Sequence, residues 1–292
     1  METQRISPFE YVPGAVLAEE SSSGSGITKE QHEKYFKDRL YQKTEYALLE
    51  SLYRLPYLTK KNMERFADYR LQDKKYAGYD NIIKQLEKDG CLRRFVYQDN
   101  RFYRLSDEAT AYFVEKLDPK GNHKMQIPSE HDVSHVLECA ALAQWHLSVL
   151  LGGDVKTSCF EEEVTIRKTK LQVPSYLVIE KGSMRYRVLS FSVPKVGLQM
   201  ENFLDSIIKV KEALYKWELS LKREIFLVVL VCSSTHEMLQ LSHILESLKA
   251  TSKLQVYFVA EPNTAFSKGL DLLYIAEKED ENLVLKTISV KN

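Results

Sequence analysis

The chain has 292 residues, of which 44% are hydrophobic, which is enough for about two domains with a buried core and excludes disorder throughout. Lys and Arg together number 41, as do Asp and Glu, so the formal net charge is zero. The whole molecule therefore has no field that would draw it to nucleic acid or anionic lipid, and any such attraction must be local.

Cysteine spacing and hydropathy exclude several classes of protein. The four cysteines lie far apart without a Cys-x-x-Cys pair, which argues against a zinc site or a disulfide framework; they are Cys91, Cys139, Cys159 and Cys232. No secretory signal precedes the first domain, and no apolar run reaches the ~18 residues of a membrane helix. We therefore expect a cytoplasmic protein with reduced thiols, no cofactor, no bound metal and no membrane partner.

The first half of the chain predicts a flexible tail followed by a small helical domain. Residues 1–28 contain the polar run "EESSSGSG" and are expected to be disordered. Helices are predicted from Thr28 to Pro56, over 59–69 behind the N-cap Thr59, and over 79–89 before Gly90. A hairpin over 91–105 and a helix over 106–117 follow. Three helices, a hairpin and a helix are the order of a winged helix-turn-helix, which we place at 29–118.

The second half predicts an α/β domain. A polar linker at 119–130 contains proline and glycine and is followed by a long helix that begins near residue 131. Strands are then expected near 155–167, over the hairpin 173–195, over 224–232 and over 254–260, with helices at 200–220 and 235–251 between them and a weaker strand at the end. This alternation predicts a mixed sheet in residues 131–292.

The predicted winged helix carries the local charge that the whole chain lacks. Between Arg54 and Arg104 there are 13 Lys or Arg and 7 Asp or Glu, an excess of +6. If the helix over 79–89 and the turn before it read DNA, three residues lie near base edges: Tyr76, Tyr79 and Asn81. Phosphate contacts are expected from Lys74, Lys75 and Lys84, and wing contacts from Arg93, Arg94 and Arg101. The alternative is a protein-interaction fold whose lysines form a solvated face.

Three motifs in the second half give the chain a family resemblance. They are "HDVSHVLECAAL" at the helix start, "PSYLVIEKG" in the first hairpin strand and "YRV" in the second. Together with the winged helix they resemble the bacterial replication-relaxation family over roughly residues 40–260. That resemblance implies a winged helix joined to a domain similar to PD-(D/E)xK nucleases, in a protein of plasmids and other mobile elements.

The chain departs from that family pattern at the positions of the acids. Pro174 is kept, but Ser175 takes the first Asp position, Ser192 the Glu position and Pro194 the second Asp position, while Lys195 takes the basic one. Cleavage of a phosphodiester by such a core needs a hard cation held by carboxylates, and a serine hydroxyl is a poor substitute. Glu138 could supply one carboxylate, and Glu161–Glu163 more plausibly form a solvated edge.

These observations favour a non-catalytic protein that binds double-stranded DNA and acts in the replication, maintenance or transcription of a mobile element. Two alternatives stay open: a metal-dependent nuclease with displaced ligands, and an adaptor that uses both domains for protein contacts. A homodimer is the expectation for a winged-helix reader, because paired half-sites increase affinity. A replication or transcription protein is a further possible partner.

Overall fold

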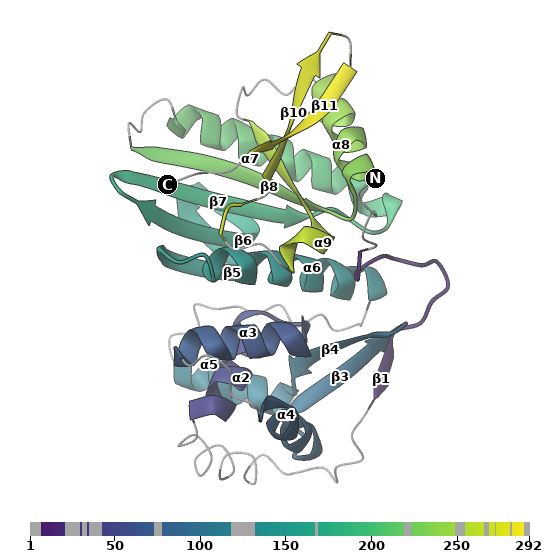
Figure 1. Cartoon of the computed structure of the whole chain (residues 1–292), viewed down its shortest axis with the longest axis vertical. Helices are drawn as coiled ribbons and strands as arrows, with labels where there is room; N and C mark the ends of the chain where they lie inside the picture. The colour runs from purple at the N-terminus through teal and green to yellow at the C-terminus, as the bar shows by residue number, and fades with distance from the viewer. Residues whose placement is uncertain are drawn as a thin grey trace. The chain divides into compact units, whose positions relative to one another are not determined.

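The computed structural model describes residues 7–20, 30, 34, 43–72, 78–117, 132–166, 169–218, 223–248, 255–265, 269–271, 273–280 and 282–288. The chain forms two compact units (Figure 1). The smaller unit is Val12–Val136, and the larger unit combines Met1–Tyr11 with Leu137–Asn292.

The smaller unit contains four helices and one antiparallel sheet in its described part. The helices are α2 (Lys43–Arg54), α3 (Lys60–Leu71), α4 (Tyr79–Lys88) and α5 (Asp107–Leu117). The strands are β1 (Ala18–Glu20), β2 (Leu58–Thr59), β3 (Leu92–Tyr97) and β4 (Asn100–Leu105), in the sheet order β1-β3-β4-β2. Three helices, a hairpin and a helix follow in the order that the sequence predicts, whereas the two short strands β1 and β2 were not predicted.

Local sequence explains how these elements begin and end. Thr59 caps α3, because its hydroxyl accepts a hydrogen bond from the backbone N of Asn62. Gly90 follows α4 at a φ of 69°, a left-handed conformation that glycine adopts without strain. The apolar faces then meet in a core whose largest fully buried rings include Phe66, Phe95 and Phe113.

The N-terminal segment differs from the prediction of a disordered tail over residues 1–28. Phe9 is fully buried in the larger unit, Ser7 is buried beside it, and residues 18–20 form β1 in the smaller unit. The serine- and glycine-rich run that suggested disorder lies at 21–26, outside the described residues. The prediction rested on the polar composition of residues 1–28 as a whole, and it overlooked the apolar stretch "PFEYV", which precedes this run and contains the buried Phe9.

The larger unit is built on one seven-stranded mixed sheet. Its strands are β5 (Val155–Ile166), β6 (Thr169–Lys181), β7 (Met184–Ser192), β8 (Glu224–Cys232), β9 (Val256–Ala260), β10 (Leu273–Glu279) and β11 (Asn282–Ile288). They lie in the order β11-β10-β9-β8-β7-β6-β5. Pairing is parallel between β7, β8 and β9 and antiparallel elsewhere. The predicted mixed sheet is therefore confirmed.

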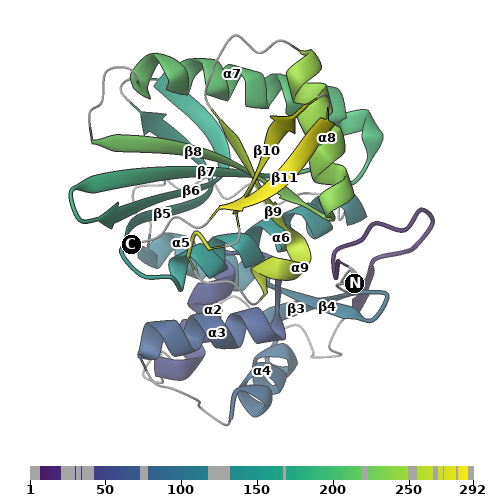
Figure 2. The same ribbon diagram turned by 45° about the horizontal axis from the view of Figure 1, so that its top comes forward.

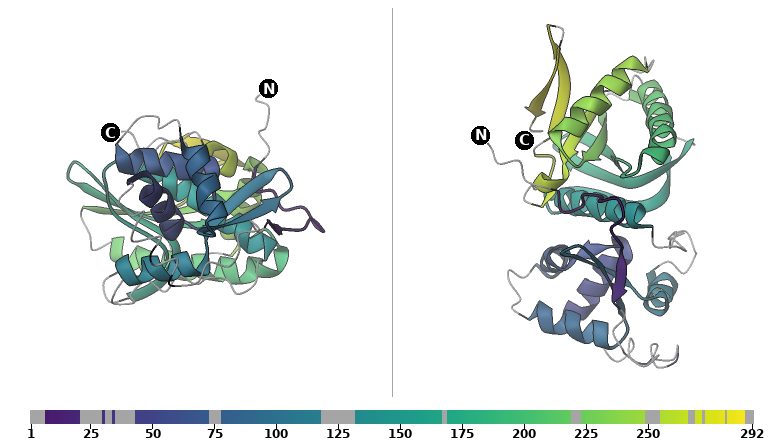
Figure 3. Two further views of the ribbon diagram at one scale, coloured as in Figure 1. Left: turned by 90° about the horizontal axis from the view of Figure 1, so that it is seen from below. Right: turned by 90° about the vertical axis from the view of Figure 1, so that its right-hand side faces the viewer.

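Helices cover both faces of this sheet. Helix α6 (Val133–Leu150) lies on one face, and α7 (Met200–Glu218) and α8 (Thr235–Ser247) lie on the other (Figure 3). The core on the α7 and α8 side includes Leu189, Ile207, Phe226 and Leu241. The central strand β8 is therefore buried between helices, which is why its sequence is a nearly continuous apolar run.

Three elements near the end of the chain were missed or only partly foreseen. The short helix α9 (Glu261–Thr264) directly follows β9, and β10 pairs with β11 along its whole length (Figure 2). Strand β10 ends in "EKE", charged residues that carry no strand signal of their own.

Among the described residues no helix is both long and apolar enough to cross a membrane. The four cysteines are free thiols, and all but Cys159 are buried.

Candidate functional site

Helix α4 presents one apolar face to the smaller unit and one polar face to solvent. Its apolar side chains alternate with polar ones at helical spacing, and Ile83 and Leu86 are almost completely buried. On the opposite face Asn81, Lys84 and Lys88 are exposed. Within the described part of the chain neither lysine forms an ion pair. Two of the predicted contact residues, Asn81 and Lys84, are therefore accessible to a ligand.

Tyr79 does not lie where a base contact requires it. The side chain is 5% exposed, and its hydroxyl donates a 2.6 Å hydrogen bond to Asp68 Oδ1 on α3. An aromatic residue at the first turn of a reader helix suggested base contact, but the same residue also serves as a core ring whose hydroxyl needs a partner. The structure therefore corrects this prediction. Three other predicted contacts, Lys74, Lys75 and Tyr76, lie outside the described residues.

The two arginines of β3 that the sequence predicted as wing contacts are held in ion pairs. Arg93 contacts Asp107 at 2.9 Å and Glu19 at 3.7 Å. Arg94 contacts Glu20 at 2.7 Å and Glu87 at 3.1 Å. Both guanidinium groups are about two-thirds shielded, with side-chain exposures of 32% and 30%. They were predicted to contact DNA from the wing, but in the structure acids from β1, α4 and α5 pair with them.

Arg101 on β4 remains available. It is exposed, lies opposite Val96 on β3, and forms no ion pair with the described residues. Its charge also acts on Glu87 of α4. Burial raises the pKa of Glu87 above its usual value, and the positive charges of Arg94 and Arg101 partly offset that rise. We name Asn81, Lys84, Lys88 and Arg101 the α4–wing surface.

In the larger unit, Ser175, the serine at the first expected Asp position, faces α6 together with Ser190, which was not one of the expected acid positions. Ser175 on β6 and Ser190 on β7 are cross-strand partners, and both are fully buried. His146 Nδ1 lies 2.9 Å from Ser175 Oγ, and Trp145 Nε1 donates a 2.8 Å hydrogen bond to Ser190 Oγ. The other ring nitrogen of His146 lies 2.7 Å from Ser158 Oγ on β5. The hydroxyls of these three serines therefore link strands of the sheet to side chains of α6.

Ser192 and Pro194 carry no polar contact of this kind. Ser192 lies opposite Val231 of β8, and its hydroxyl is buried without a hydrogen-bond partner among the described residues. Pro194 is buried just beyond the end of β7. These positions bring no carboxylate to the end of the strand.

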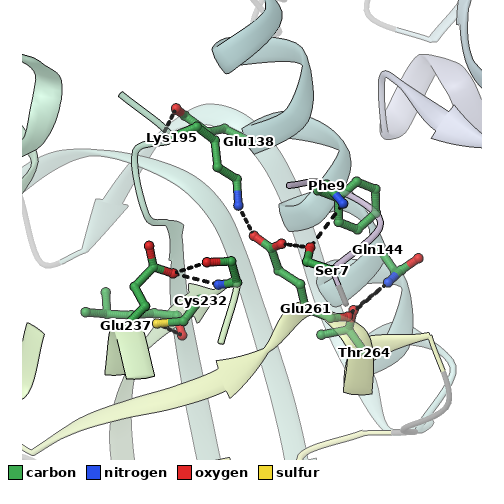
Figure 4. Close-up of polar contacts among 11 residues, drawn as sticks. Ser7, Phe9, Glu138, Gln144, Lys195, Cys232, Glu237, Glu261 and Thr264 are labelled. Atoms are coloured by element: carbon green, nitrogen blue, oxygen red, sulfur yellow. Dashed lines mark hydrogen bonds and ion pairs between the residues drawn. The ribbon is translucent and has the colours of Figure 1, made fainter. Parts of the chain in front are cut away.

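Lys195 instead belongs to a buried polar cluster at the ends of β7, β8 and β9 (Figure 4). Its ammonium forms an ion pair with Glu261 of α9, and the two side chains are 4% and 0% exposed. The other oxygen of Glu261 accepts a hydrogen bond from Ser7, which docks the N-terminal segment. Glu138 of α6 accepts a 2.8 Å hydrogen bond from the backbone N of Lys195.

A third carboxylate, that of Glu237, completes this cluster. Glu237 of α8 accepts hydrogen bonds from the backbone N and the hydroxyl of Ser233, at 2.6 and 2.9 Å. Burial raises the pKa of Glu261, and Lys195 and the hydrogen bond from Ser7 oppose that rise. Burial also raises the pKa of the Cys232 thiol well above its usual value, which keeps it protonated and unreactive.

The cluster members that sequence reasoning missed lie far apart in the chain. Lys195 and Glu261 are 66 residues apart, and Ser7 and Glu261 are 254 apart. No spacing rule links such positions. The side chains of Glu161–Glu163 lie outside the described part of the structure. Among the side chains described, no three His, Cys, Asp or Glu residues converge as a metal site.

Comparison with known proteins adds a distant structural likeness. No protein-family model matches the sequence, and no curated protein matches it. Among solved structures, restriction endonuclease FokI is similar with a TM-score of 0.30 and 12% identity, over 78% of this chain and 43% of that one. The chain therefore spans less than half the length of that endonuclease, and a likeness at this level does not bear on its function.

Proposed function

We propose that the smaller unit is a winged helix-turn-helix that binds double-stranded DNA, with α4 as the reader helix and the β3–β4 hairpin as the wing. The α4–wing surface is the observation that carries this proposal. Its lysines and Arg101 are exposed and form no ion pair in the described part of the chain, whereas six other basic residues of this unit are engaged in ion pairs.

The chemistry of this surface fits a duplex. An α-helix fits the major groove, where an Asn side chain can bond both the N6 and the N7 of adenine. Asn81 is exposed in the first turn of α4, which supports this role. Lys84 and Lys88 follow on the same face, as residues that contact phosphates do, and Arg101 projects from the wing.

The larger unit, we infer, serves as a non-catalytic scaffold. The two cross-strand serines are fully buried and lie within hydrogen-bond distance of α6 side chains, so their hydroxyls meet protein groups, and neither supplies the carboxylate oxygens that a hard cation prefers. Lys195, the residue at the basic position of the motif, is neutralised by Glu261. Both features are those of a polar network that supports the fold rather than of a metal-dependent site.

The cellular role follows from the family resemblance and is proposed with it. We infer that the protein belongs to a bacterial plasmid or other mobile element and acts there in replication, maintenance or transcriptional control. A homodimer on paired half-sites, with a replication or transcription protein as partner, would be consistent with that role.

The decisive experiment measures binding to duplex fragments from the native host as a function of salt, with and without Mg²⁺. We expect a shift whose affinity falls steeply with salt, because each phosphate contact contributes a slope of about −0.9 in log K against log salt. The variant Lys84→Ala/Lys88→Ala should bind more weakly and lose up to about two such contacts.

A matched variant separates this contact from a general effect of charge. Lys156→Ala/Lys209→Ala removes two exposed lysines from the larger unit and should leave binding unchanged. Equal weakening by both pairs would contradict a reader surface on α4. Cleavage that requires Mg²⁺ would show a nuclease with displaced ligands. If no shift is seen at any salt concentration, the protein does not bind duplex DNA, and a protein-protein adaptor becomes the favoured function.

A further inference from the structure

The outer edge of β3 in the smaller unit is covered by β1, a strand from the N-terminal segment. Ala18, Glu19 and Glu20 pair antiparallel with Val96, Phe95 and Arg94 of β3. β1 extends the sheet of the proposed wing by one strand, so the edge that would otherwise be open is paired. The segment that does this is not part of the predicted winged helix.

The two glutamates of β1 place negative charge beside the arginines of the proposed wing. Three arginines meet four carboxylates there; the arginines are Arg93, Arg94 and Arg104, and the acids are Glu19, Glu20, Glu87 and Asp107. These contacts lie on two faces of the sheet, because successive residues of a strand point to opposite sides: Glu19 and Asp107 meet Arg93 on one face, and Glu20 and Glu87 meet Arg94 on the other. Without β1 each face would lose one carboxylate. The strand therefore makes both faces less attractive to phosphate.

β1 is also held weakly. It has only three residues, and all three are exposed, so its pairing buries little apolar surface. Its charge contacts are partly solvated pairs of the kind that contribute little to stability. Nearby, the backbone of Val12 contacts the buried side chain of Tyr97: its N–H donates a 2.7 Å hydrogen bond to the Tyr97 hydroxyl, and its carbonyl oxygen lies 3.5 Å from the same hydroxyl.

We propose that β1 is an autoinhibitory strand that covers the wing arginines in the free protein and leaves β3 when duplex DNA binds. This inference rests on the proposed DNA-binding function. Phosphate groups then replace Glu19 and Glu20 as partners of Arg93 and Arg94, whose second acidic partners, Asp107 and Glu87, remain on the smaller unit. Arginine suits this exchange because its guanidinium binds carboxylate and phosphate with the same geometry.

The first test changes the charge of β1 in the full-length protein. Glu19→Gln/Glu20→Gln should bind a host duplex fragment up to about tenfold more tightly, because two exposed ion pairs no longer compete with phosphate. The control Glu108→Gln/Glu115→Gln removes two exposed acids from α5 of the same unit. It alters net charge equally and should change affinity much less.

The second test fixes the strand in place. Ala18 and Val96 are cross-strand partners, so Ala18→Cys/Val96→Cys, made with Cys159→Ser to remove the half-exposed thiol, should form a disulfide. The oxidised protein should bind duplex DNA more weakly than the same protein after reduction. Refolding is not a concern in this comparison, because both states are measured on one sample.

The outcomes separate this inference from the function on which it rests. Tighter binding by the β1 variant alone, with reversible weakening by the disulfide, supports autoinhibition. If Lys84→Ala/Lys88→Ala weakens binding but the β1 variant matches its control and the disulfide has no effect, DNA binding stands and autoinhibition is wrong. If no form of the protein binds duplex DNA, both are wrong.

Discussion

Ser175 and Ser190 lie opposite each other on β6 and β7, and each hydroxyl meets a different side chain of α6. His146 lies between Ser175 and Ser158, with both ring nitrogens within hydrogen-bond distance of a hydroxyl. The imidazole is 1% exposed. Removing one partner from such a network leaves a buried polar group unpaired, which costs more than removing both partners.

His146→Leu should therefore destabilise the protein by about 2–4 kcal/mol, since it removes packing and leaves the fully buried Ser175 hydroxyl without this partner. Adding Ser175→Ala should restore about 1 kcal/mol or more of that loss. Urea unfolding of the two single variants and the double variant measures the coupling. Strictly additive losses would show that the His146–Ser175 contact does not contribute to stability.

Strong local patterns explain why much of the fold was predictable. The amphipathic α4, the apolar run of β8 and the turn at Gly182 each carry their own signal, and the order of elements follows from them. Strand β1 has no such signal, because its three residues are exposed and its pairing depends on the edge of β3. A strand of that kind is defined by its partner and not by its own sequence.

The residues of the candidate sites also fall into those that the sequence could predict and those that it could not. Exposure of Asn81 and Lys84 follows from helical periodicity, so the sequence could place them. The ion pairs of Arg93 and Arg94 join β3 to β1, α4 and α5, and the sequence offers no rule for those distances. Tyr79 was ambiguous in principle, because an aromatic ring at a helix start suits either a base or a core.

Gly152 should not tolerate a side chain. A Cβ added there would lie 2.3 Å from the Cα of Gly269, which is backbone and cannot move aside as a flexible side chain could. Gly269 is held in place by a 2.9 Å hydrogen bond from its N to Ser148 O. We expect Gly152→Ala to cost at least about 2 kcal/mol, as overpacking does.

Gly197 provides the matched control for this substitution. An added Cβ there meets no atom within 4 Å, and its φ is not in the left-handed region. Gly197→Ala should change stability by no more than about 0.5 kcal/mol. Thermal unfolding of both variants decides the matter: equal melting temperatures would mean that the backbones at Gly152 and Gly269 do not approach this closely in solution.

Glu224 should contribute stability that depends on pH. Arg187 donates two hydrogen bonds to its carboxylate, at 2.7 and 3.0 Å, and these lower the pKa of Glu224 below the usual 4.5. A carboxyl group whose pKa is lowered on folding stabilises the protein above pH 4.5, and that contribution is lost as the pH falls through the folded-state pKa.

Glu224→Gln should thus be less stable than the wild type by about 1–3 kcal/mol at pH 7. The difference should shrink as the pH falls below 4.5. Denaturant unfolding at a series of pH values gives this curve. A difference that stays constant down to pH 3 would assign the loss to packing and not to the charge of Glu224.

Lys195 and Glu261 form the buried ion pair at the centre of the polar cluster, with side-chain exposures of 4% and 0%. Removing one member of such a pair leaves the other as an uncompensated buried charge. Lys195→Met should accordingly cost about 3–5 kcal/mol at pH 7. Glu138 bonds the backbone N of residue 195, so that contact persists in the variant.

The loss in Lys195→Met should also shrink as the pH falls, but at higher pH than the loss in Glu224→Gln, because here the variant gains stability by taking up a proton. Burial raises the pKa of Glu261 above 4.5, and the lysine that opposes the rise is gone, so the folded protein takes up a proton that the unfolded chain releases. Stability then increases as the pH falls from 7 toward 4.5. Lys195→Met/Glu261→Gln has no buried charge at either position and should show neither the full loss nor this pH dependence. A single variant whose stability does not respond to pH would place Glu261 in contact with water and contradict the buried pair.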